Sequence, residues 1–238
     1  MRGRKEALVL LPGFLCDRTV WLDQIAAVSD AAECTCADYG MLDSIPAMAE
    51  LVLRDAPDQF SVAGHSMGGR IAFEILRQAP QRVRRLAVFN SGSAARSAGD
   101  AGQEEAQRRR QLLAIARSDG MRTMAATWVQ GMVAPNRLQD HALIESIVQM
   151  FERKSPDAFE AQMNALLGRP DATPVLAQIR CPVLILTGRE DAWSPPVTHQ
   201  MMAGAILGSK LVIVPGSGHM STMEQPAAVA RAMRDWLQ

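Results

Sequence analysis

A serine flanked by glycines lies between a strand-like and a helix-like segment of the chain. Gly64-His65-Ser66-Met67-Gly68 has the spacing G-x-S-x-G, which lets a serine occupy a sharp strand-to-helix turn. A side chain at Gly64 or Gly68 would collide across such a turn, and glycine tolerates backbone angles that other residues resist. The turn exposes the Ser66 hydroxyl and directs the Met67 N–H towards the reacting oxygen. The motif predicts a nucleophile with one adjacent oxyanion donor.

The segments on either side of the motif match this interpretation. Residues 59–63 form a short apolar run typical of a buried strand. Residues 69–76 carry apolar side chains at helical spacing, and the pattern stops near Pro80. Strand, tight turn and helix is the context in which this motif is meaningful.

A serine hydroxyl becomes a good nucleophile only when a base accepts its proton. His219 is the best of four candidates because it follows a buried strand-like run, in a glycine-rich loop that can reach a neighbouring strand end. His65 is adjacent to Ser66, so its side chain should point elsewhere. His141 and His199 fall in helical stretches with polar neighbours, which predicts surface or packing roles.

The base needs an acid that fixes its tautomer, and this acid should also follow a strand. The apolar run 183–187 is followed by Gly188-Arg189-Glu190-Asp191. We favour Asp191 over Glu190, because the shorter carboxylate precedes a proline-containing loop that leads into a helix. The alternative role for Asp191 is a turn or helix-start carboxylate.

Apolar strand-like runs alternate with helical patterns along most of the chain. This alternation predicts an α/β fold with a mostly parallel, twisted sheet and helices on both faces. The predicted strands are residues 7–11, 33–37, 59–63, 85–90, 183–187 and 211–214. The predicted helices are residues 20–28, 45–54, 67–78, 196–203 and 226–237.

The alternation is interrupted between residues 93 and 179, where only helical periodicity occurs. Four helices are predicted there, at residues 104–116, 121–132, 139–154 and 156–166. A helical block of this size between two strands indicates an insertion over one end of the sheet. Its Arg108-Arg109-Arg110 run follows acidic residues by about one turn, which is typical of solvated charges on a helix.

Composition limits the classes of partner. The 238 residues include 48% hydrophobic residues, as in an ordinary globular protein, and form one sizeable domain with an insertion. Lysine plus arginine and aspartate plus glutamate both number 25, which argues against nucleic acid and against an anionic membrane surface. No apolar run approaches the roughly 20 residues that span a bilayer. The charged start lacks the pattern of a signal peptide, so we expect a cytoplasmic protein.

Four cysteines in a chain of this length do not indicate a disulfide framework. Cys34 and Cys36 lack metal-ligand spacing, and Cys181 directly precedes a predicted strand. All four are expected to behave as small apolar residues. Cys16 is of additional interest because it lies close to a predicted active-site loop.

The chain resembles the α/β-hydrolase superfamily over nearly its whole length. The resemblance rests on the chain order Ser66, Asp191, His219 and on the motifs Gly-His-Ser-Met-Gly-Gly, Gly-Arg-Glu-Asp and Gly-Ser-Gly-His around them. It implies an α/β-hydrolase fold with a core formed by residues 1–92 and 180–238. Residues 93–179 would then be a helical cap that shapes the substrate pocket.

The resemblance also implies a second oxyanion donor in the loop after the first strand. The backbone N–H of Phe14 occupies that place and would act together with that of Met67. Many relatives have His-Gly where this chain has Pro12-Gly13. The change keeps the donor but removes a polar side chain that can order the loop.

By resemblance, the protein is a carboxylesterase-like serine hydrolase acting on a small to medium ester, thioester or lactone. Ser66 would attack the carbonyl, His219 would act as base and then acid, and Asp191 would stabilise the imidazolium. No metal or organic cofactor is implied. Family members that cleave haloalkanes or epoxides use an aspartate nucleophile, which Ser66 argues against.

Two other readings stay open. A lyase or a hydrolase of C–C bonds can use the same three residues, because the pocket selects the reaction. A non-catalytic ligand receptor can also have this fold. The sequence leaves the physiological substrate and the oligomeric state undetermined.

Overall fold

The computed structural model describes residues 5–238, so the charged residues 1–4 of the predicted core lie outside the described part. One six-stranded sheet has the order β2-β1-β3-β4-β5-β6, and all neighbouring strands are parallel. The strands are β1 (Glu6–Leu11), β2 (Ala32–Cys36), β3 (Phe60–His65), β4 (Val83–Phe89), β5 (Val183–Gly188) and β6 (Lys210–Val214).

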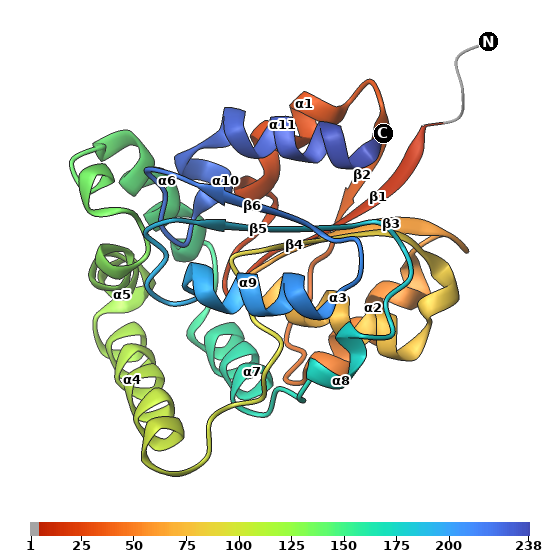
Figure 1. The fold of residues 1–238 in the computed structure, drawn as a ribbon. Helices are drawn as coiled ribbons and strands as arrows, with labels where there is room; N and C mark the ends of the chain where they lie inside the picture. Colours follow the sequence, from red (N-terminus) through yellow and green to blue (C-terminus); the bar gives the residue numbers. More distant parts are fainter. Residues whose placement is uncertain (1–4) are drawn as a thin grey trace.

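Eleven α-helices connect or cover these strands in the described residues. They are α1 (Leu22–Val28), α2 (Ile45–Asp55), α3 (Met67–Gln78), α4 (Gly99–Ser118), α5 (Gly120–Trp128), α6 (His141–Glu152), α7 (Pro156–Leu167), α8 (Thr173–Leu176), α9 (Pro196–Ala205), α10 (Ser221–Glu224) and α11 (Pro226–Leu237). Helices α1 and α11 pack together on one face of the sheet, and α2, α3 and α9 cover the other (Figure 1).

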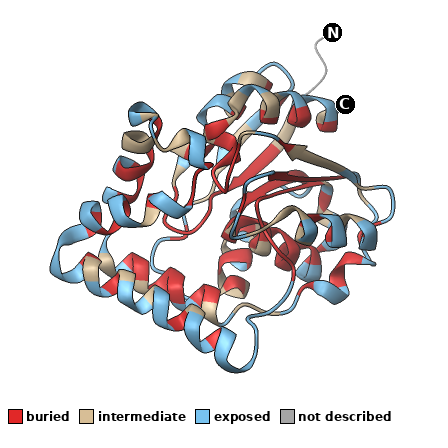
Figure 2. Cartoon of the chain, turned by 60° about the vertical axis from the view of Figure 1, so that its left-hand side comes forward, coloured by how far each residue is buried: buried red, intermediate tan, exposed pale blue. Residues whose placement is uncertain are grey.

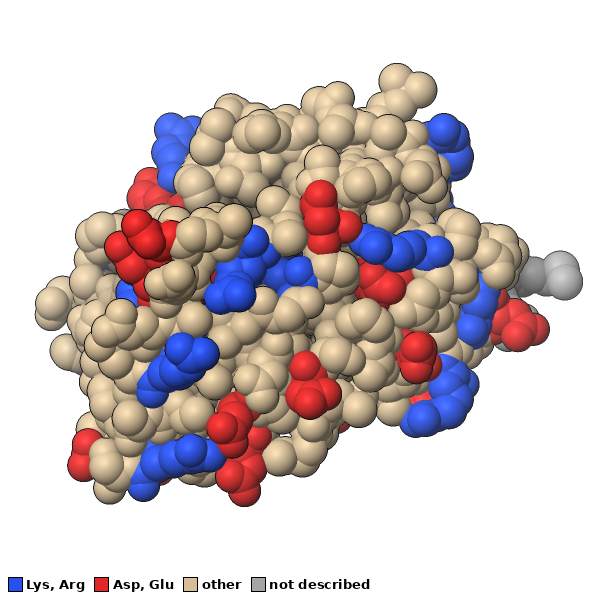
Figure 3. All heavy atoms as spheres, turned by 90° about the horizontal axis from the view of Figure 1, so that it is seen from below, with Lys and Arg blue, Asp and Glu red and all other residues tan. Residues whose placement is uncertain are grey.

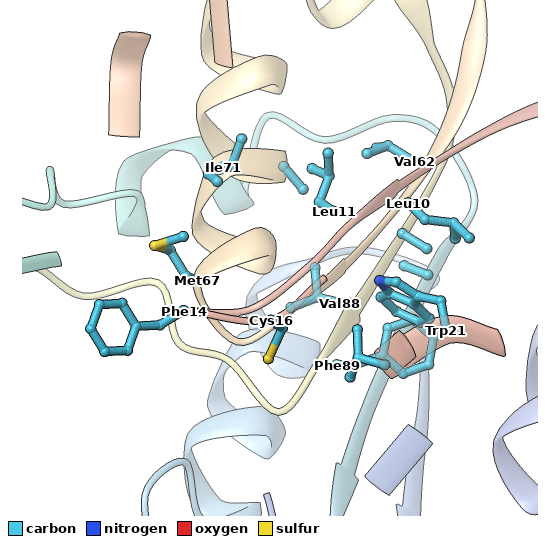
Figure 4. Packing of buried hydrophobic residues seen from close by; sticks show 14 of the residues in the cluster. Leu10, Leu11, Phe14, Cys16, Trp21, Val62, Met67, Ile71, Val88 and Phe89 are labelled. Carbon is cyan, nitrogen blue, oxygen red and sulfur yellow. The ribbon is translucent and has the colours of Figure 1, made fainter. Parts of the chain in front are cut away.

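Burial explains the sequence pattern of the strands. Every residue of β3 and of β5 is buried, because a parallel sheet with helices on both faces has no solvent-facing side. Figure 2 shows the inner strands largely buried, whereas the edge strands β2 and β6 are partly exposed and most helices expose one side. Figure 4 shows part of the apolar cluster where strands meet α3. The ring centroids of Trp21 and Phe89 lie 5.3 Å apart at the end of β4.

The predicted α/β architecture is confirmed, with element ends shifted by a few residues. Residues 18–21 form a 3-10 turn instead of the start of the first helix, because the Asp17 carboxylate accepts the Thr19 N–H and begins a tighter turn. Helices α8 and α10 were not predicted. Each is only four residues long, too short to produce a helical hydrophobic pattern.

Residues 93–179, here called the insertion, contain helices α4 to α8 and no strand. Helices α4, α5 and α6 lie beyond the carboxyl ends of the strands, at the left of Figure 1. Ligands of open parallel sheets bind outside those ends, so this arrangement puts insertion helices beside the expected site.

Acidic and basic side chains are interspersed over the face drawn in Figure 3, as the balanced composition leads one to expect. Within residues 5–238, no helix has both the length and the apolar character needed to cross a bilayer.

Candidate active site

Ser66 occupies the turn between β3 and α3 in a backbone conformation that few residues other than glycine adopt. Its φ is 53° and its ψ is −113°, and its N–H donates to the Phe89 carbonyl at 2.8 Å. A Cβ on Gly64 would overlap the Gly68 carbonyl, and one on Gly68 would overlap the Leu11 carbonyl. The two glycines of the motif are therefore required by close backbone approach, as predicted.

The three side chains singled out from the sequence meet above the strand ends. His219 Nε2 lies 2.9 Å from Ser66 Oγ, and His219 Nδ1 lies 3.0 and 3.1 Å from the two carboxylate oxygens of Asp191. A carboxylate only accepts, so Nδ1 carries the proton and Nε2 is free to accept the Ser66 proton. This is the geometry of an activated serine nucleophile.

Asp191 is held as a carboxylate although its side chain is buried. Burial raises its pKa, but the neighbouring His219 and hydrogen bonds from Asn90 and the Ser194 N–H outweigh burial and lower the pKa to about 2. The Trp193 and Ser194 N–H groups donate to Oδ1 at 3.0 and 2.9 Å. Asp191 therefore orients His219 while remaining charged over the whole neutral range.

Asn90 is a site residue that sequence reasoning missed. It directly follows β4, has a φ of 49° and is fully buried. Its amide donates to Asp191 Oδ2 at 2.9 Å and to the Gly218 carbonyl at 3.1 Å, so it connects the loop of the acid to the loop of the base. The available signal was an asparagine at a strand end, since asparagine tolerates positive φ better than most residues.

Glu224 is a second missed residue, and it fixes the backbone around His219. Its buried carboxylate accepts the N–H groups of Gly218 and Met220 on either side of the histidine, at 2.9 and 3.0 Å. It also accepts the N–H of Ala134, in the insertion, at 2.7 Å. Burial raises the pKa of Glu224 against the lowering effect of these bonds.

Two of the remaining histidines, His65 and His199, bond backbone groups around the site. His65 Nε2 donates to the His219 carbonyl at 2.8 Å, and burial lowers the His65 pKa to about 3. His199 Nε2 accepts the Ser91 N–H at 3.1 Å, and burial lowers the His199 pKa to about 4. Both imidazoles are therefore neutral packing residues, as predicted for His199, and neither contacts the Ser66 hydroxyl.

The two expected oxyanion donors lie on the turns beside Ser66. Within residues 5–238, the N–H groups of Phe14 and Met67 donate to no protein acceptor, so both are available to a ligand. The Phe14 loop is held by Gln162 of α7, whose side-chain oxygen accepts the Leu15 N–H at 2.8 Å. Gln162 thus orders the loop in which Pro12 precedes Gly13.

A cavity of about 640 Å³ opens over Ser66. Phenylalanine and tryptophan side chains from the core and the insertion line it: Phe14, Trp128, Phe151 and Trp193. The Trp128 ring contacts Phe14 edge-on and stacks on Trp193, with ring centroids 5.3 Å apart in both pairs. Trp193 in turn lies 5.0 Å from His219. The fourth aromatic residue, Phe151, lies 5.4 Å from Trp128.

The other sequence candidates take no part in the chemistry of Ser66. Cys16 lines the cavity, but burial raises the pKa of its thiol far above neutral, so it is an apolar wall residue. Burial raises the pKa of Cys36 to about 12. No group of histidine, cysteine and carboxylate side chains suited to a metal occurs in the part of the chain that the structure describes.

Fold and site together define a member of the α/β-hydrolase class. The model of the alpha/beta hydrolase family matches residues 8–232, so the chain belongs to that family, and the predicted fold and family are confirmed.

Several named relatives are similar over most of their length. A pimeloyl-[acyl-carrier protein] methyl ester esterase of Nitrosomonas europaea is 25% identical, with 94% of this chain and 92% of that protein covered. A 2-hydroxy-6-oxononadienedioate/2-hydroxy-6-oxononatrienedioate hydrolase of Escherichia coli is 25% identical, with 98% and 87% covered. The solved structure of a thermophilic esterase from Thermogutta terrifontis is 29% identical, with a TM-score of 0.84 and 99% and 90% covered.

Proposed function

We propose that the protein is a serine esterase that cleaves a small to medium carboxylic ester, thioester or lactone through an acyl-enzyme. One observation carries the proposal: Ser66 Oγ lies 2.9 Å from an imidazole nitrogen whose other nitrogen donates to a buried carboxylate. The relatives named as esterases support ester cleavage as the reaction class.

The residues have the following roles in this proposal. His219 removes the Ser66 proton as the oxygen attacks the carbonyl carbon, and Asp191 stabilises the resulting imidazolium. The N–H groups of Phe14 and Met67 bind the oxyanion, and each such donor is worth about 3 kcal/mol of barrier. His219 then gives its proton to the leaving alcohol and later activates the water that releases the acid. The insertion acts as the cap that encloses the acyl group.

Hydrolysis of p-nitrophenyl esters of increasing acyl length, by the wild type and by Ser66→Ala, tests the proposal. We expect turnover by the wild type and its loss in the variant, with the chain-length profile reporting the depth of the cavity. Equal rates for the two proteins would exclude Ser66 as the nucleophile.

A C–C bond hydrolase is the second candidate, because one similar protein is named for a hydroxy-oxo-dioate that contains no ester. If the wild type leaves every ester intact but consumes a vinylogous 1,5-diketone, the second candidate replaces the first. Tight ligand binding without any turnover would instead favour a receptor.

A further inference from the structure

Four arginine side chains line the cavity that contains Ser66, and one carboxylate accompanies them. One of the four, Arg108, has a largely exposed side chain that pairs with Glu104, and the other three converge on one wall. Arg70 of α3, Arg109 of α4 and Arg169, which follows α7, all line the cavity, as does Glu105. The insertion and the core thus each contribute guanidinium groups to one wall. The site chemistry described so far uses none of them.

Glu105 is already engaged by two of the arginines. Arg169 holds it with two bonds of 2.8 Å, one to each carboxylate oxygen, and Arg109 lies 3.2 Å from Oε1. The Arg109 guanidinium also lies 5.5 Å above the Phe14 ring. Stacking on Phe14 brings the arginine group next to the loop that carries an oxyanion donor.

Arg70 is the cation left without a counter-ion. Within residues 5–238 it forms no ion pair, since the nearby Glu105 pairs with Arg109 and Arg169, and its one hydrogen-bond acceptor is the Ala94 carbonyl at 2.7 Å. Burial, reinforced by the charge of Arg169, lowers the pKa of Arg70 to about 9. A partly buried guanidinium beside two others is destabilised by desolvation and by repulsion, and a bound anion would relieve that repulsion.

The position of Arg70 relates this charge to the reacting serine. Arg70 follows Ser66 by four residues, so it lies one helical turn, about 6 Å, further along α3. The contact with Gly92 also places the Arg70 side chain at the cavity. Arg70 Nη2 lies next to Gly92, and Gly92 lines the cavity. An anionic group at this wall would therefore lie a few carbons from a carbonyl attacked by Ser66.

We propose that Arg70, together with Arg109 and Arg169, forms a binding subsite for a carboxylate carried by the ester substrate. The planar guanidinium fork matches a carboxylate and gives orientation as well as attraction. The proposal rests on the proposed esterase function and narrows its substrate class to esters with a free acid group, such as half-esters of dicarboxylic acids.

Paired substrates that differ only in this charge test the subsite. Mono-p-nitrophenyl adipate and its neutral methyl ester place the group on the acyl side. Acetoxybenzoate, with the acid para to the ester, and its methyl ester place it on the alcohol side. We expect kcat/KM for the charged member to exceed that of its neutral partner in one of the two pairs.

Arg70→Gln should reduce that preference roughly tenfold or more, since a charge-assisted fork is lost while the cavity keeps its size. Arg70→Lys should restore part of it. Arg77→Gln is the matched control: Arg77 lies on the same helix outside the cavity, with a side chain 40% exposed, and should keep the wild-type preference.

The outcomes separate this proposal from the esterase function. Ser66-dependent hydrolysis with no charge preference in either pair, or a preference that Arg70→Gln leaves intact, overturns the subsite and leaves the esterase standing. If the wild type cleaves no ester, titration calorimetry with adipate decides: binding that Arg70→Gln weakens at least tenfold supports the subsite, and equal or absent binding overturns it.

Discussion

The sheet and the insertion contribute to the cavity in different ways. The proposed reacting groups come from loops at the ends of β3, β5 and β6, where parallel strands bring them to one edge. The insertion contributes walls: Trp128, Phe151, Arg109 and Arg169 line the same cavity. In the proposed reaction the chemistry depends on the geometry of the parallel sheet edge, whereas the choice of substrate depends on how the insertion packs over it. Substitutions in the two regions should therefore differ both in size and in kind.

Removing the base should produce the largest effect. We expect His219→Ala to lower kcat by about 10⁴-fold or more, because Ser66 then has no proton acceptor. The double variant with Ser66→Ala should lose little beyond either single variant, since the residues act as a unit. Steady-state kinetics of the three proteins measures both quantities, and fully additive losses would show that His219 does not act through Ser66.

Changing the acid should cost somewhat less. Asp191→Asn keeps the size of the side chain but removes the charge that fixes the Nδ1 proton and stabilises the imidazolium, so kcat should fall by about 10³- to 10⁴-fold. Glu190→Gln is the control from the preceding position, where an exposed carboxylate accepts the Ser217 N–H. A comparable loss in both variants would assign the effect to the loop and not to the acid.

Substitution of Glu224, which bonds both the His219 loop and the insertion, should have an intermediate effect on rate. In the wild type, the N–H groups of Gly218, Met220 and Ala134 donate to the Glu224 carboxylate. In Glu224→Gln, the amide NH₂ cannot accept these bonds, so we expect the His219 loop to shift. A small displacement of a catalytic group costs up to about 100-fold, and we expect a fall of 10- to 100-fold in kcat with KM nearly unchanged.

A positioning role predicts more than a loss of rate. Glu224→Asp retains the charge and should recover part of kcat, whereas a purely structural defect would lower thermal stability in both variants without that recovery. Unchanged kcat in Glu224→Gln would contradict the role given to the carboxylate. Circular dichroism melts beside the kinetics separate these cases.

The insertion itself should give a smaller effect on rate. Gln162→Leu removes the acceptor of the Leu15 N–H and loosens the Phe14 loop, so kcat should fall about 3- to 10-fold on neutral esters. Gln149→Leu is the matched change on α6, where the exposed amide donates to Glu145. A loss as large as that of Asp191→Asn would mean that the insertion takes part in the chemistry itself.

The same division explains what the sequence could predict. The sequence predicts Ser66, Asp191 and His219 because each follows a strand-like run. The strand ends of a parallel sheet converge, whatever the conformation of the loops that follow them. The glycine spacing around Ser66 carried further information, since only glycine permits the close approach to the Leu11 and Gly68 carbonyls.

The rest depended on packing between distant segments. Arg108-Arg109-Arg110 was interpreted as a solvated run, and the expected helix pairs with Glu104 and Glu105 are present. Yet Arg108 and Arg109 both line the cavity, and Arg109 lies beside Arg169, 60 residues further along the chain, because α4 and α7 pack together. Periodicity reports one face of one helix and does not report which neighbour that face meets.

The smallest expected effect is on the pH dependence of the free energy of unfolding in acid. It reports the electrostatic environment of one residue at the sheet edge, Asp191. The pKa of Asp191 is about 2 in the folded protein and 3.8 in an unfolded reference, so between these values the unfolded chain binds more protons. Its contribution to stability is complete above pH 4 and is lost as the pH falls through 2; the shift corresponds to about 2 kcal/mol. Urea unfolding of wild type and Asp191→Asn from pH 2 to 5 should show the free energy of unfolding rising more steeply with pH in the wild type. Parallel curves would mean that burial, and not the bonds from Asn90 and His219, sets the energy of this carboxylate.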